Sequence, residues 1–355
     1  MNTFLTILLA IVAFGILIFI HELGHFIAAR IFKVTVNEFS IGMGPTLVSY
    51  ESKKSHIKYS LRMLPLGGFV SMAGEDEETS DPNGFNKKPA WQRLIITAAG
   101  PLVNLVAGFL AMIIVVAATN IGSTVVYETL DEESFLEYYP ESEYETEFHD
   151  PGLRAGDKIV RVNGKRVSIL DELSYEVMRN GHEPVELEII RDGESMTLHD
   201  VRFPVIVSDG QRFGMMNVVV YRAEKGFFST IGMSFEKSWL TVRTCWESLF
   251  DLITGRYTIA AVSGPVGIAS AMGDAARDGF LSFLNIIVLI SINLGFMNLL
   301  PFPALDGGRL VMLLVEIISK KKPPAKVEAI INMVGLVILL TFSVFILVKD
   351  VIQLF

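Results

Sequence analysis

Cysteine, histidine and basic tracts are all scarce in this sequence. Cys245 is the single cysteine among 355 residues, which excludes an internal disulfide bond. The net charge is -9, and no basic tract with interleaved aromatic residues occurs, so nothing indicates binding of nucleic acid. The N-terminus lacks the basic region of a cleavable signal peptide, and the apolar segment that follows is too long for one. We therefore expect a retained transmembrane helix there.

The composition is too apolar for an ordinary soluble protein and too charged for membrane helices alone. Hydrophobic residues make up 51% of the chain and charged residues 19%, with a mean hydropathy of +0.45. The runs long enough to span a bilayer are 4–32, 91–119, 280–300 and 330–347. The predicted fold class is a polytopic α-helical membrane protein with four transmembrane helices, a membrane-associated β-hairpin or sheet, and an inserted α/β domain.

Basic residues gather in two of the connecting segments. Lys and Arg recur between residues 30 and 93, and again between residues 309 and 326. Such loops remain in the cytosol, so residues 121–262 should lie outside it, as should the N-terminus. We expect a multi-pass protein of the plasma or inner membrane, with its active site near the cytosolic side.

Three ionisable residues interrupt the first apolar run, namely His21, Glu22 and His25 of the sequence His-Glu-Leu-Gly-His. Histidines four apart on a helix point the same way and can bind one Zn²⁺. Glu22 is better placed to take a proton from a water than to bind the metal. A chance HExxH motif in a chain with six histidines has a probability of about 1%. A glutamate in a bilayer is rarely retained without a function, so we predict a metallohydrolase site.

Asp306 is the candidate for the third metal ligand. Two histidines leave a catalytic zinc site one protein ligand short, and a carboxylate at the cytosolic end of another span can supply it. Asp306 follows the third apolar run in the sequence Pro301-Phe302-Pro303-Ala304-Leu305-Asp306-Gly307-Gly308. The prolines and glycines predict unwound backbone around Asp306, which is tolerated at membrane depth only in a protein-lined site. Taken alone, Asp-Gly-Gly would be an ordinary turn.

Residues 42–70 predict a strand, a turn and a second strand. Glycines flank an alternating stretch at 56–62, and an exposed edge there could pair with an extended peptide. A plain hairpin packed on the helices explains the pattern equally well. Gly100, Pro101 and Asn104 interrupt the second apolar run near its start, which predicts a kink facing the site, although such residues are common in membrane helices.

The segment between the second and third spans has three parts. Residues 128–150 carry ten acidic residues and no Lys or Arg, so we expect a solvated, poorly ordered insertion. Residues 151–167 predict a turn, a strand, an Asn-Gly hairpin turn and another strand, and resemble a PDZ domain. The PDZ helix would be 170–179, and further strands would be 185–191, 197–203 and 218–220. The carboxylate-binding loop of PDZ domains is not recognisable in the sequence.

A helix is predicted over residues 228–253, with apolar residues every three or four positions and charges on the other side. This pattern is typical of a helix at a bilayer surface, and equally of a helix that packs on the external domain. Residues 263–268 predict a turn before the membrane.

As a whole the chain resembles the site-2 proteases, intramembrane zinc metalloproteases, and specifically the regulator of sigma-E type with a PDZ domain. The resemblance rests on residues 21–25, on 298–308 as an N-x-x-P-x-P-x-L-D-G motif, and on 65–70, 86–101 and 264–267. It implies one zinc per chain held by His21, His25 and Asp306, with Glu22 as general base. It also implies that Asn298, Gly67 and Gly68 bind substrate, with a membrane-embedded sheet receiving the unwound substrate strand.

The same resemblance implies the partners: the lipid bilayer, and single-span membrane proteins already trimmed outside, such as anti-sigma factors or signal-peptide remnants. The predicted domains are 1–120 and 263–355 as the membrane protease core, 121–225 as the external PDZ domain, and 226–262 as the interfacial helix. Two other classes stay open, an inactive membrane-anchored PDZ scaffold and a zinc transporter. The intact Glu22 argues against the first, and the lack of internal repeats argues against the second.

Overall fold

The computed structural model describes residues 3–75, 79–138, 151–208, 211–256, 262–322 and 324–352. These residues form two compact units, Met1–Ala111 with Thr244–Phe355, and Met112–Arg243. Most of the acidic insertion predicted at 128–150 lies outside the described residues. Its beginning is ordered, contrary to expectation: a short helix, α3 (Glu132–Tyr138), forms there and buries Phe135 completely.

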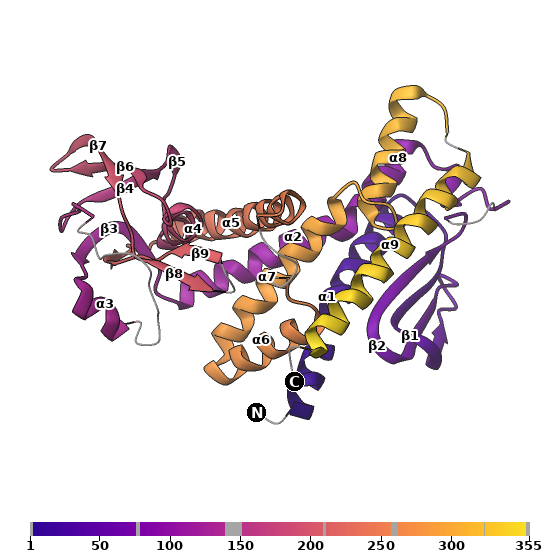
Figure 1. Ribbon diagram of the computed structural model, residues 1–355. Coiled ribbons are helices and arrows are strands. Elements are labelled where there is room, and N and C mark those ends of the chain that lie inside the picture. The colour runs from indigo at the N-terminus through magenta and orange to yellow at the C-terminus, as the bar shows by residue number, and fades with distance from the viewer. Residues whose placement is uncertain are drawn as a thin grey trace. The chain divides into compact units, whose positions relative to one another are not determined.

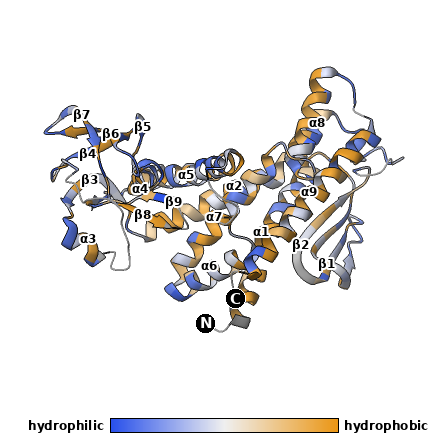
Figure 2. Cartoon of the chain, in the orientation of Figure 1, coloured by the Kyte–Doolittle hydropathy of each residue, from blue (hydrophilic) through white to orange (hydrophobic). Residues whose placement is uncertain are grey.

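The first unit is built mainly of helices (Figure 1). They are α1 (Thr3–Ile31), most of α2 (Ala90–Ala118), α6 (Pro265–Asp278), α7 (Phe280–Leu299), α8 (Asp306–Ser319) and α9 (Ala325–Ile352). Among the described helices, four are long and apolar enough to cross a membrane: α1, α2, α7 and α9. In Figure 2 these helices are coloured mainly as hydrophobic. The prediction of four spans is therefore confirmed as far as the length and composition of the helices are concerned.

Two helices of this unit were not predicted. Residues 263–268 were interpreted as a turn, but α6 begins at Pro265, where a proline without an N–H suits the first helical position. Asp306 was expected within unwound backbone, but it is the first residue of α8. Non-helical backbone is confined to residues 300–305, just before it.

The strands β1 (Val36–Glu51) and β2 (Lys58–Met72) confirm the predicted hairpin and also fold back on themselves (Figure 1). Residues 38–41 pair with 58–61 on one side and with 68–71 on the other. Gly42, Gly44 and Gly67 have positive φ, a conformation that glycine adopts without steric cost, and they allow this change of direction. The segment Gly68–Met72 thereby becomes an edge of the sheet.

The second unit contains a main sheet, a separate pair of strands and the helix α4, which contacts both. Its main sheet has the order β10-β3-β4-β6-β7, with β5 paired to β4. The strands are β3 (Gly122–Thr129), β4 (Lys158–Val162), β5 (Lys165–Arg166), β6 (Val185–Arg191), β7 (Glu194–Val201) and β10 (Val218–Arg222), and β8 (Val205–Ser208) pairs separately with β9 (Gln211–Gly214). The helix is α4 (Leu170–Asn180). The predicted elements of this region are confirmed, including the turn at Asn163 and Gly164, which both have positive φ.

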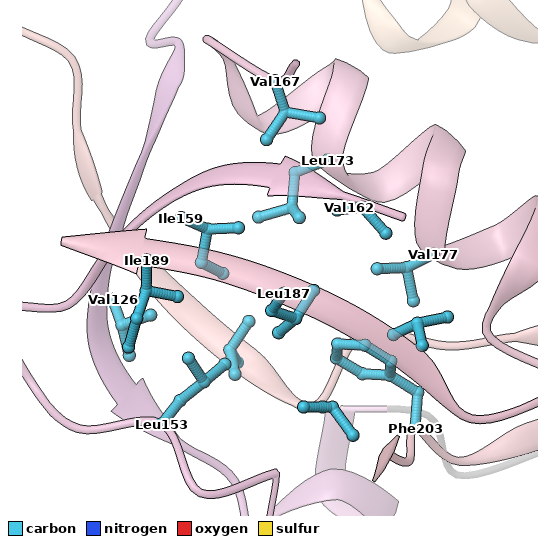
Figure 3. Packing of buried hydrophobic residues seen from close by; sticks show 13 residues of the cluster. Val126, Leu153, Ile159, Val162, Val167, Leu173, Val177, Leu187, Ile189 and Phe203 are labelled. Carbon is cyan, nitrogen blue, oxygen red and sulfur yellow. The ribbon is translucent and has the colours of Figure 1, made fainter. Parts of the chain in front are cut away.

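Buried aliphatic residues of the sheet and α4 form the core of this unit, as Figure 3 shows. Val162, Leu173, Val177 and Leu187 are fully buried, because alternate strand residues and one face of the helix point inward. Burying each such side chain contributes about 1.5–3 kcal/mol.

The amphipathic helix predicted at 228–253 is α5 (Phe227–Thr254). Its polar side makes ion pairs with α4: Lys237 lies 3.1 Å from Asp171, and Arg243 lies 2.6 Å from Glu176. Large apolar residues are exposed along its other side, namely Phe228, Phe235, Trp239, Trp246, Phe250 and Ile253. The predicted amphipathic helix is confirmed, with charged residues paired to α4 and large apolar residues exposed.

Candidate active site

Three potential metal ligands meet in the first unit. His21 and His25 lie one turn apart on α1, and Asp306 is the first residue of α8. The Nε2 atoms of the two histidines are 3.2 Å apart. The Oδ2 atom of Asp306 lies 3.0 Å from Nε2 of His21 and 3.4 Å from Nε2 of His25.

This triangle of donor atoms fits a zinc ion. Ligand bonds of about 2.0–2.2 Å in a tetrahedron separate neighbouring donor atoms by about 3.3–3.6 Å, close to the spacings of 3.0–3.4 Å found here. Two imidazoles and one carboxylate also match the three protein ligands of a catalytic zinc site. The residues present therefore suit zinc in both chemistry and spacing.

Helix α2 supplies no ligand, but it contacts both histidines. The Nδ1 atom of His25 lies 2.9 Å from the carbonyl oxygen of Ile96. The Nδ1 atom of His21 lies 3.3 Å from the side-chain amide of Asn104. In each histidine, Nδ1 thus contacts α2 while Nε2 faces Asp306.

Two glycines allow α1 and α2 to approach so closely. A Cβ on Gly24 would lie 2.4 Å from the carbonyl oxygen of Ala99. A Cβ on Gly100 would lie 2.3 Å from Nε2 of His25, the atom that faces the other ligands. Any side chain at Gly100 would therefore intrude on the candidate metal site.

A cavity of about 270 Å³ adjoins the three ligands. Glu22, Asn298 and Val70 line it, so Glu22 faces the same space as the ligands without being one of them. Val70 belongs to the sheet edge Gly68–Met72, so this edge lies beside the site.

The predicted substrate-binding residues differ in position. Gly68 lies at the site: a Cβ there would be 3.5 Å from Cγ of Glu22 and 2.7 Å from the carbonyl oxygen of Ser40. Gly67 occupies the bend before it, where its Cβ would face Met43 instead. Asn298, near the end of α7, donates a hydrogen bond of 3.0 Å to the carbonyl oxygen of Leu294.

Ion pairs join parts of this unit that are distant in the sequence. Arg309 of α8 pairs with Glu75, and both residues line the cavity. Arg93 of α2 pairs with Glu316 of α8 and is buried. These contacts tie the helix that begins with Asp306 to the rest of the unit.

Sequence reasoning did not find the contacts that α2 makes with the histidines. Asn104 was interpreted only as part of a kink facing the site, and the carbonyl of Ile96 carries no sequence signal. The available signal was the amide itself, because a buried amide in an apolar helix requires a hydrogen-bonding partner.

Comparison with known proteins gives a consistent result. A family model described as Peptidase family M50 matches residues 9–342. A putative zinc metalloprotease of Clostridium acetobutylicum is 33% identical over 99% of this chain and 98% of its own length. A putative zinc metalloprotease of Fusobacterium nucleatum is 32% identical, with 99% and 100% covered. The regulator of sigma-W protease RasP of Bacillus subtilis is 26% identical, with 99% of each chain covered.

Proposed function

The chain belongs to peptidase family M50, the site-2 proteases, and is a zinc metalloprotease with four candidate membrane-spanning helices. From that membership we propose that it cleaves peptide bonds within the transmembrane segments of single-span membrane proteins. His21, His25 and Asp306 hold the zinc ion in this proposal, and Glu22 is the general base. The observation that carries it is the convergence of the three donor atoms at 3.0–3.4 Å beside a cavity that Glu22 lines.

The residues divide the chemistry between them. Bound zinc supplies a Lewis acid that polarises the scissile carbonyl and makes a water more acidic. Glu22 takes the proton from the attacking water and returns it to the nitrogen of the leaving amine. Positioned acid–base groups of this kind contribute about 10² to 10⁴-fold to the rate.

The sheet edge Gly68–Met72 receives the substrate in this proposal. A transmembrane helix satisfies its own backbone hydrogen bonds, so a protease must unwind it and offer replacements. An edge strand offers them by adding the substrate as a further strand. Asn298 lines the same cavity, and its amide retains hydrogen-bonding capacity beyond its bond to Leu294, so we assign it to the substrate backbone.

The second unit acts as a PDZ-like domain that screens substrates outside the cytosol. Support comes from its sheet, on which α4 packs, and from the resemblance of residues 151–167 to PDZ sequences. Its side of the membrane follows from the basic residues of 30–93 and 309–326, which favour the cytosol. A cytosolic signal from a reporter placed at Asn163 would contradict this orientation.

The exposed apolar side of α5 lies at the bilayer surface in the same scheme. Its aromatic residues include Trp239 and Trp246, and tryptophan is favoured at the membrane–water interface. The substrates we infer are membrane proteins already trimmed outside, such as anti-sigma factors or signal-peptide remnants. A relative bears the name regulator of sigma-W protease, which supports the first of these classes.

The experiment that tests the proposed function compares Glu22→Gln with Asp306→Ala. Zinc content and cleavage of a membrane peptide are measured on both purified variants. The first variant should keep the metal and lose activity, whereas the second should lose both.

A further inference from the structure

We propose that Asn104 is a positioning residue: its side-chain oxygen accepts the Nδ1 proton of His21 and so fixes the ring form that presents Nε2 to the metal. The inference rests on the proposed role of His21 as a zinc ligand. It assigns a function to a residue of α2, a helix that contributes no ligand.

The surroundings of Asn104 carry the proposal. The residue is fully buried, and its amide nitrogen lies 3.3 Å from Nδ1 of His21. Its oxygen, Oδ1, has no hydrogen-bonding partner in the part of the chain that the structure describes. The nitrogen and oxygen of an amide have nearly the same shape, and the hydrogen-bond network decides which is which. Turning the amide by 180° brings the oxygen to Nδ1 of His21.

The chemistry of the ligand requires that orientation. A neutral imidazole that binds a metal through Nε2 carries its proton on Nδ1, where it must donate to an acceptor. An amide nitrogen cannot accept this proton, but an amide oxygen can. Zinc binding through Nε2 therefore requires the amide orientation in which the oxygen of Asn104 gains a donor.

His25 shows the same arrangement with a backbone group. Its Nδ1 lies 2.9 Å from the carbonyl oxygen of Ile96, which can only accept a hydrogen bond. That contact sets the proton on Nδ1 and leaves Nε2 free. Ile96 and Asn104 are eight residues apart, about two turns, and so lie on the same face of α2. One face of this helix thus supplies an acceptor to each histidine.

Helix packing is the alternative role for Asn104. Its backbone oxygen accepts a hydrogen bond of 2.9 Å from the hydroxyl of Ser291, which joins α2 to α7. This contact uses the backbone and does not require an amide side chain. Ser291 therefore offers a matched control, because Ser291→Ala disturbs the same helix contact and leaves the side chain of Asn104 in place.

The test uses the purified full-length chain and the metal alone. Zinc affinity is measured by competition with a graded chelator for Asn104→Leu, Asn104→Asp and Ser291→Ala, and Asn104→Ala serves as a smaller replacement if the leucine variant does not fold. The visible spectrum of the cobalt-substituted proteins reports the geometry of the ligands. We expect the leucine variant to bind zinc about 10 to 100-fold more weakly, with an altered cobalt spectrum. The aspartate variant, which keeps an acceptor, and Ser291→Ala should remain close to the wild type.

Three outcomes would overturn the proposal. Wild-type zinc affinity in the leucine or alanine variant would show that the contact is not used. An equal loss in Ser291→Ala would assign the effect to helix packing, and an equal loss in Asn104→Asp would reject the acceptor role. Failure of the proposed function looks different: the wild type would then hold no stoichiometric zinc, or His21→Ala would hold as much as the wild type.

Discussion

Gly100 faces His25 across the interface of α1 and α2, where a single added methyl group would lie 2.3 Å from the Nε2 atom. The ring of His25 therefore fits in its place only because residue 100 carries no side chain. In the proposed metal site, α2 therefore matters although it contributes no ligand.

Gly100→Ala should accordingly abolish zinc binding and cleavage together. The added Cβ must displace the ring of His25 or separate the two helices, and either movement breaks the ligand triangle. Metal analysis after mild chelation measures the loss. Gly232→Ala is the matched control, because a Cβ at Gly232 meets no atom within 4 Å. Stoichiometric zinc in Gly100→Ala would show that the helices separate without affecting the site.

Gly68→Ala should impair cleavage but retain the metal. Its Cβ would lie 2.7 Å from the carbonyl oxygen of Ser40, so the sheet edge beside Glu22 must shift, while the zinc ligands are on other elements. Displacement of a substrate-positioning element by about 1 Å can cost about 10²-fold in rate. Steady-state cleavage of a membrane peptide checks the loss of activity, and zinc content checks that the metal is retained. An unchanged rate would remove this edge from the substrate path.

The second unit should lose stability in acid because of Asp157. Arg191 donates to both oxygens of this buried carboxylate, at 2.8 and 2.7 Å, and the amide of Arg154 donates at 2.7 Å. Burial raises the pKa of Asp157, but these hydrogen bonds lower it further, to a value below the ordinary 3.8. A lowered pKa in the folded state means that the stabilisation is complete above about pH 4 and is lost as the pH falls through the folded value.

Asp157→Asn leaves Arg191 without its charged partner and should destabilise the unit at neutral pH. Amide exchange in β4 and β6 under increasing urea measures this difference, which should shrink below about pH 4. Asp171→Asn removes a more exposed ion pair, with Lys237, and should cost much less. An equal effect of the two substitutions at neutral pH would contradict the assignment.

Deletion of residues 125–222 should change which substrates are cleaved. If the second unit screens substrates by size, the shortened enzyme will accept membrane proteins with untrimmed external domains. Cleavage of short substrates should continue, because the ligands and Glu22 belong to the first unit. Cleavage of a matched pair of long and short substrates is the measurement. Unchanged discrimination between them would refute the screening role.

The sequence predicted those features that depend on local pattern. Spans follow from runs of apolar residues, and His21, Glu22 and His25 follow from their spacing on one helix. Asp306 could be proposed because a third ligand was needed, but its place at the start of α8 could not, since prolines before it suggested only unwinding. The turn predicted at residues 263–268 was wrong for a similar reason. Proline favours both turns and the first position of a helix, and Pro265 begins α6.

Contacts between distant segments could not be predicted from pattern. The doubled pairing of residues 38–41 depends on how two bends combine in space. The approach of Gly100 to His25, and of Asn104 to His21, depends on how α1 and α2 pack. A glycine or asparagine in an apolar run is compatible with many packings, so only the folded chain shows which one occurs.

The separation of metal binding from proton transfer is the central claim, and zinc content beside cleavage in Glu22→Gln tests it most directly. Glutamine preserves the size of the side chain and removes the base. The variant should retain about one zinc per chain while cleavage falls by about 10² to 10⁴-fold, whereas Asp306→Ala loses zinc and activity together. Loss of zinc from Glu22→Gln as readily as from Asp306→Ala would make Glu22 a ligand, and full activity in Glu22→Gln would contradict the mechanism altogether.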